Sequence, residues 1–126
     1  MTEMMVLKPG AGHPITVEPA GARVVVRVAG RVIADSTSAM TLQEADYPPV
    51  HYVPRQDVDL SALQRSEHTS YCPFKGHAAY YSIPSAGERG LNAVWTYEQP
   101  YDAVPEIKDH LAFYVNRMDS VEELPL

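Results

Sequence analysis

The stretch "ARVVVRVAGRVIADS", residues 22–36, decides the fold class of this chain. Its two halves, 22–28 and 30–36, are rich in β-branched valine and isoleucine, which favour an extended backbone. Ala29 and Gly30 separate the halves, and glycine supplies the positive backbone angles that a tight hairpin turn needs. The stretch therefore predicts a β-hairpin and, with it, a mainly β domain.

The rest of the 126-residue chain continues in short extended segments. Eleven prolines and seven glycines are spread through it and leave little room for long helices. Extended segments are expected at 39–45, 48–54, 77–83, 91–98 and 111–124, and one helical turn at 104–108. The adjacent Tyr80 and Tyr81 must point to opposite faces of their strand, so at most one of them can face a given pocket.

The best helical candidate is "DVDLSALQRSE", residues 57–67. Asp57 or Asp59 can cap its start, and Leu60 and Leu63 lie three residues apart on one face. The segment spans about two turns, so packing must stabilise it. The chain is thus predicted to contain roughly seven strands and one or two short helices.

Length, charge and hydropathy limit the function classes. One domain over 1–126 is expected, with 1–15 and 120–126 as flexible or edge segments. Ten basic against sixteen acidic residues give a net charge of −6, which argues against a nucleic-acid partner. No stretch approaches the roughly 18 apolar residues of a membrane span, and the first residues lack the apolar core of a signal peptide. No membrane partner and a cytoplasmic location are therefore expected.

Metal and cofactor binding are not expected either. The single cysteine, Cys72, excludes an internal disulfide and a multi-cysteine zinc site. The five histidines are spaced irregularly, and no two of them have the i, i+4 spacing of a helical metal site. The phosphate-binding pattern GxxxxGK[ST] is also missing.

The stretch "CPFKG", residues 72–76, carries the first candidate site. Cys72 can serve as a nucleophile if a cation such as Lys75 favours its thiolate, or it is a small buried hydrophobe that enters a strand. Gly76 suits a tight turn with Lys75 at its tip. Lys75 is then either an exposed turn residue or a point cation for a carboxylate or phosphate.

A second group of candidates combines a cation with aromatic rings. Arg55 suits bidentate recognition of an anion, or it pairs with Asp57 at the expected helix start. Tyr52, Trp95 and Tyr97 are typical of cross-strand core packing. If they face one cavity, they form a wall for a flat or apolar ligand.

Several segments resemble one family in sequence and spacing: "GRVIADS", "LQEADYPPVHYVPRQDV", "TSYCPFKGHAAYYSI", "NAVWTYEQP" and "HLAFY". Over about residues 22–118 they resemble the family known as domain of unknown function 427, also labelled nucleotidyltransferase-like. The resemblance implies a β-tent-like architecture, in which two antiparallel sheets meet at an angle and enclose a cleft. Many β-tent relatives fasten the sheets with a four-cysteine zinc site. With one cysteine, this chain is expected to use hydrophobic packing instead, with Trp95 as an anchor.

The residues do not match the nucleotidyltransferase label. Such enzymes typically carry a Gly-Ser pair followed by two carboxylates on a strand, which hold Mg²⁺. No Gly-Ser dipeptide occurs in this chain, and Asp57-Val58-Asp59 falls at an expected helix start.

Three functions from different classes remain. The first is a small-molecule binding domain for an anionic or aromatic ligand, with a cleft between the sheets. The residues expected to line that cleft are Tyr52, Arg55, Lys75, Trp95 and Tyr97. The second is an enzyme of unknown reaction that uses Cys72 or a group of Glu44, Lys75 and Arg55. The third is an interaction module that binds another protein, or a second copy of itself as a homodimer.

Overall fold

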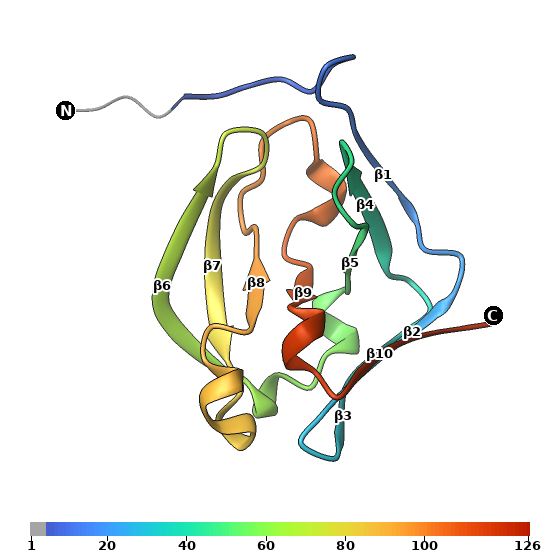
Figure 1. The fold of residues 1–126 in the computed structure, drawn as a ribbon, viewed down its shortest axis with the longest axis vertical. Coiled ribbons are helices and arrows are strands. Elements are labelled where there is room, and N and C mark those ends of the chain that lie inside the picture. The colour runs from blue at the N-terminus through green and yellow to red at the C-terminus, as the bar shows by residue number, and fades with distance from the viewer. Residues whose placement is uncertain (1–4) are drawn as a thin grey trace.

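The structure, a computed structural model, describes residues 5–126 as ten strands joined by short turns (Figure 1). The strands are β1 (Ile15–Pro19), β2 (Arg23–Val28), β3 (Arg31–Ser36), β4 (Met40–Glu44), β5 (Val50–Tyr52), β6 (Gln64–Cys72), β7 (Gly76–Ser82), β8 (Val94–Thr96), β9 (Leu111–Phe113) and β10 (Ser120–Leu124). The 3-10 helices are η1 (Arg55–Asp57), η2 (Leu60–Ala62), η3 (Pro84–Gly90), η4 (Pro105–Ile107) and η5 (Val115–Arg117). The predicted mainly β class is confirmed.

Three antiparallel sheets, rather than two, organise the described strands. Their orders are β6-β7-β8-β9, β1-β4-β5 and β10-β2-β3. In Figure 1 the four-stranded sheet stands opposite β4 and β5. Val53 and Leu111 exchange two backbone hydrogen bonds of 2.8 Å, which join the end of β5 to β9. The four-stranded sheet and the sheet of β1, β4 and β5 are therefore in backbone contact at this point.

The hairpin predicted from the opening stretch is confirmed as β2 and β3. Its turn residues, Ala29 and Gly30, have φ angles of 51° and 74°, as a two-residue turn of type I′ requires. The backbone N–H of Gly30 donates to Asp119 Oδ2 at 3.0 Å. This bond attaches the turn to the segment that leads into β10, the neighbour of β2.

The helix predicted over 57–67 is wrong. The chain makes two single 3-10 turns, η1 and η2, and then enters β6. Val58 bridges to Ala34, and the N–H of Asp59 donates to the carbonyl of Ile33 at 2.8 Å. A two-turn helix begins with a costly nucleus, so these contacts with β3 outweigh the local helical preference.

The single strand predicted over 111–124 is divided in the structure. β9 ends at Phe113, η5 turns the chain, and β10 begins at Ser120. The N–H of Asp119 donates to the carbonyl of Arg27 at 2.8 Å, which directs the chain onto β2. The last strand therefore belongs to a different sheet from β9. The other extended segments contain β4, β5, β7 and β8, and the helical turn at 104–108 is η4.

The apolar core consists of two clusters. The first gathers mainly valine and alanine side chains and one phenylalanine, and it includes Val24, Val26, Val53, Val94 and Phe113. The second is rich in tyrosine and includes Leu42, Tyr52, Tyr80, Tyr97 and Ile107. As the sequence predicts, Tyr80 and Tyr81 point apart, because Tyr80 belongs to the second cluster and Tyr81 packs against the first.

No helix within residues 5–126 combines the length and the apolar character that crossing a membrane would require.

Candidate functional site

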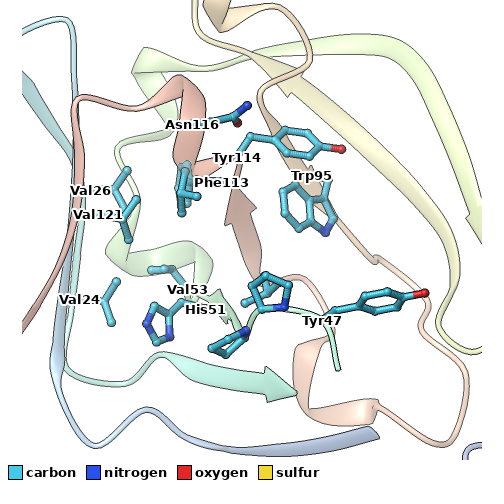
Figure 2. A pocket seen from close by; sticks show the side chains of 14 residues that line it. Val24, Val26, Tyr47, His51, Val53, Trp95, Phe113, Tyr114, Asn116 and Val121 are labelled. Atoms are coloured by element: carbon cyan, nitrogen blue, oxygen red, sulfur yellow. The ribbon is translucent and has the colours of Figure 1, made fainter. Parts of the chain in front are cut away.

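An apolar pocket of about 400 Å³ opens where the two core clusters meet (Figure 2). Val24 and Val26 of β2 and Val53 line it from the first cluster. Val50 and Trp95 line it from the second cluster. Its volume lies within the roughly 300–1,000 Å³ typical of small-molecule sites.

Two loop segments form the rim of this pocket. The first is Tyr47-Pro48-Pro49, which leads into β5. The N–H of Tyr47 donates to the carbonyl of Glu44 at 2.9 Å, and Gln43 Nε2 donates to the carbonyl of Tyr47 at 2.6 Å. Two consecutive prolines restrict the backbone that follows. The backbone of Tyr47 at the rim is therefore held by both hydrogen bonding and local stiffness.

The second rim segment is Tyr114-Val115-Asn116, which runs into η5. The N–H of Tyr114 donates to the carbonyl of Ala93 at 3.0 Å, and the N–H of Arg117 donates back to the carbonyl of Tyr114 at 3.0 Å. The tight turn holds the Tyr114 ring beside the Trp95 indole, with ring centroids 4.6 Å apart, as Figure 2 shows.

The Trp95 indole is held from behind by Tyr52. Trp95 Nε1 donates to the Tyr52 hydroxyl at 3.2 Å, and the two rings meet edge to face with centroids 6.3 Å apart. Burial raises the pKa of Tyr52 well above its ordinary value, so the hydroxyl stays neutral at physiological pH. Because the indole N–H is already bonded inside the protein, Trp95 offers the pocket its apolar ring surface.

The polar groups at the pocket are few, and those of His51 are engaged within the protein. His51 Nδ1 lies 2.8 Å from Thr41 Oγ1, and His51 Nε2 lies 2.5 Å from Glu123 Oε1. No lysine or arginine is among the residues that line the pocket. The arrangement suits burial of an uncharged ring or chain, since a charge there would lack a partner.

The structure brings together four of the five residues expected to line a cleft. Tyr52 contacts Trp95 and lies 6.5 Å from Tyr97 between ring centroids, and Lys75 Nζ lies 5.9 Å from the centre of the Tyr97 ring. Of these four, Trp95 lines the apolar pocket, while Tyr52 and Tyr97 lie in the second core cluster behind it. Ligand binding by these residues stays a prediction.

Arg55 lies apart from that group. Its Nη1 donates to the Tyr81 hydroxyl at 3.2 Å, and Arg65, which pairs with Glu98 at 2.9 Å, approaches the same ring. Burial raises the pKa of Tyr81, but the hydrogen bonds from Arg55 and Arg65 outweigh it and leave the pKa below its ordinary value. Arg55 therefore has different partners from Glu44 and Lys75. The structure does not bring these three residues together as the catalytic group that the sequence offered.

Lys75 is paired within the protein. The turn that Gly76 allows, with φ of 110°, places Lys75 Nζ 2.6 Å from Glu44 Oε1, and His13 Nε2 lies 2.8 Å from Glu44 Oε2. The His13 ring stacks on Phe74 at 4.1 Å. Burial would raise the pKa of Glu44, but the hydrogen bonds from Lys75 and His13 prevail and lower it. Both oxygens of Glu44 are thus occupied by cationic or hydrogen-bonding partners.

Cys72 ends β6 and packs, half-buried, against the second core cluster. Its carbonyl accepts the N–H of Lys75 at 3.2 Å, which closes the turn. The Lys75 ammonium is directed to the Glu44 carboxylate. Within residues 5–126, no three histidine, cysteine or carboxylate side chains are grouped in a way that suits a metal ion.

A family model described as "Domain of unknown function (DUF427)" matches residues 16–124. The chain belongs to this family. The match confirms the family inferred from the motifs and extends beyond the 22–118 that they cover. No curated protein matches the chain.

In this DUF427 domain, sequence reasoning missed most of the pocket rim. Tyr47 falls between the expected extended segments, the two prolines after it are expected only as part of the segment 48–54, and Tyr114 and Val115 as part of a strand. One usable signal is present, because the consecutive prolines Pro48-Pro49 are typical of a loop rather than of a paired strand. No local signal marks the turn at η5, which depends on pairing with β2.

Proposed function

We propose that this DUF427 domain binds a small molecule whose apolar, ring-bearing body fills the pocket between β2, β5 and the Tyr114–Asn116 turn. One observation carries the proposal. Tyr47, Tyr114 and Val115 remain 60%, 37% and 68% exposed although they border a pocket that reaches the core. Large apolar side chains gathered around a concavity are typical of binding sites, because ligand burial removes their surface from water.

Of the two ligand types expected from the sequence, anionic and aromatic, the lining favours the aromatic one. Aromatic and proline side chains form flat walls, which suit a planar or alicyclic body. The absence of lysine and arginine from the lining disfavours an anion inside the pocket itself. The proposed occupant is therefore an uncharged ring system, and any charged group of the ligand lies outside the pocket.

Fluorescence titration with N-phenyl-1-naphthylamine, a neutral dye that brightens in apolar surroundings, tests the proposal. Trp95 is the only tryptophan and lines the pocket, so energy transfer from its indole to the dye reports a dye bound in its vicinity. We expect saturable binding of one dye per chain. Removing the ring in Tyr114→Ala should weaken binding by about tenfold, since an aromatic contact contributes on the order of 1 kcal/mol beyond its burial.

A matched pair of variants separates the pocket from general surface hydrophobicity. Val115→Ser changes the rim, whereas Leu60→Ser changes another exposed apolar residue, 43% exposed, that does not line the pocket. We expect weaker dye binding only in Val115→Ser. Dye binding that never saturates, or an equal loss in both variants, would overturn the proposal.

A further inference from the structure

A second, polar hollow of about 520 Å³ adjoins the apolar pocket, and Tyr114 borders both. His68 and Tyr80 of the four-stranded sheet line one side of it, and Arg117 of η5 lines the other. Tyr80 lies directly opposite Trp95 in the β7–β8 register, so both project from the same face of the sheet. The hollow and the pocket are thus neighbouring parts of one face.

The Tyr114 ring forms the partition between them. Its centroid lies 4.6 Å from that of Trp95, and the Arg117 guanidinium carbon lies 5.3 Å from the same ring. Tyr114 is 37% exposed, so part of this partition is open to solvent. A ligand that packs against Trp95 therefore has to extend across only one aromatic ring, that of Tyr114, to contact Arg117.

The hydrogen-bond partner of Arg117 distinguishes it from most arginines in this protein. Five others pair with carboxylates, namely Arg23, Arg27, Arg31, Arg65 and Arg89. No carboxylate within residues 5–126 forms an ion pair with Arg117, whose Nη1 instead donates to the backbone carbonyl of Leu91. A guanidinium has five N–H donors in a planar fork, so most of its donors are left for an oxyanion.

One acidic residue, Glu88 of η3, also lines the hollow and opposes an anion there. Glu88 is exposed, whereas Arg117 is half-buried. Water and salt screen an exposed charge more strongly than a partly buried one. Inside the hollow, the positive charge of Arg117 therefore outweighs the negative charge of Glu88. The fork geometry of the guanidinium adds directional hydrogen bonds.

We propose that the ligand of the apolar pocket carries one oxyanion, a carboxylate or sulfonate, about one ring width from its apolar body, and that Arg117 binds this group in the hollow. The inference rests on the proposed function of the pocket. It assigns Arg117 as the specificity-determining residue that distinguishes an amphipathic acid from a neutral compound with the same ring system. It also explains how an anionic ligand can be bound by a pocket whose described lining holds no lysine or arginine.

Two dyes that differ by a single sulfonate test the inference directly. 1-Anilinonaphthalene-8-sulfonate is the sulfonated counterpart of N-phenyl-1-naphthylamine, and the two should displace each other from the pocket. We expect the sulfonated dye to bind about tenfold more tightly at low salt, because a hydrogen-bonded charge contributes on the order of 1.5 kcal/mol. This advantage should shrink at about 0.5 M salt.

Three variants locate the effect. Arg117→Gln should remove the advantage of the sulfonated dye over the neutral dye, and Arg117→Lys should retain part of that advantage. Arg89→Gln removes an arginine that pairs with Asp119 and does not line the hollow, so both dyes should bind as before. Glu88→Gln should strengthen binding of the sulfonated dye alone. Thermal unfolding of each variant checks that it is folded.

The outcomes separate the inference from the function on which it rests. If neither dye binds, the pocket proposal fails and the role of Arg117 fails with it. If the neutral dye binds but the sulfonate brings no salt-sensitive gain in the wild-type protein, the inference alone is overturned. Equal losses of the sulfonated dye in Arg117→Gln and Arg89→Gln would overturn it as well. The wild-type comparison needs no variant, so a misfolded Arg117 variant does not leave the question undecided.

Discussion

The ammonium of Lys75 lies 2.6 Å from Glu44, and the two side chains are only 13% and 12% exposed. Glu44 ends β4, and Lys75 lies in the turn between β6 and β7. The pair therefore connects the sheet of β1, β4 and β5 to the four-stranded sheet. His13, which precedes β1, bonds to the second oxygen of Glu44. The start of β1 is therefore tied to the same ion pair.

Lys75→Met is expected to lower the free energy of unfolding by about 2–4 kcal/mol, because it leaves the Glu44 carboxylate with one partner in a poorly hydrated site. The control is Lys108→Met, which removes an exposed lysine that forms no ion pair with the described residues. Urea denaturation should show a clear shift of the midpoint for Lys75→Met and almost none for Lys108→Met. A loss of the same size in both would mean that the Glu44 contact contributes nothing.

The same pair predicts a dependence of stability on pH. The pKa of Glu44 lies below its ordinary value of 4.5 in the folded protein, so the unfolded chain takes up this proton first as the pH falls. The stabilisation is complete above the unfolded pKa and is lost as the pH falls through the folded one. Between pH 7 and about pH 3, Glu44→Gln should therefore lose less stability than the wild type. Parallel curves of unfolding free energy against pH would contradict this.

Local patterns predicted the hairpin correctly because its determinants are local. The β-branched residues and the Ala29-Gly30 turn are adjacent in the chain, and β2 and β3 pair with each other. The strand β6 was missed because its residues are mostly polar and exposed, so no alternation of apolar side chains marks it. It is held by its register with β7, which sequence reasoning does not reveal.

The candidate site was predicted only in part, because some of its contacts depend on residues that are far apart in the sequence. Residue types favoured core packing of Tyr52, Trp95 and Tyr97 and left open whether they face one cavity, and the structure places their rings near one another. The partner of Lys75 lies 31 residues away in the sequence, and Arg117 reaches its hollow only because η5 reverses the chain. Such placements depend on long-range pairing, which spacing along the chain cannot encode.

Tyr52→Phe should remove the acceptor of the Trp95 indole N–H and leave that donor without a partner in a mostly buried place. We expect a loss of about 1–2 kcal/mol in the free energy of unfolding and a shift in Trp95 emission. The matched change is Tyr97→Phe in the neighbouring ring, whose hydroxyl bonds to no side chain within residues 5–126. An unchanged emission spectrum in Tyr52→Phe would show that the bond is not formed in solution.

Gly90 ends η3, the segment that also carries Glu88 into the polar hollow. A methyl group at Gly90 would lie 2.2 Å from the carbonyl oxygen of Ile83, which cannot move freely because the Ile83 N–H bonds to the Gly90 carbonyl at 2.9 Å. Gly90→Ala is therefore expected to cost about 1–3 kcal/mol or more through backbone displacement. Gly12→Ala meets no atom within 4 Å and serves as the control. Thermal unfolding should rank Gly90→Ala well below Gly12→Ala, and equal midpoints would mean that η3 adopts a looser conformation.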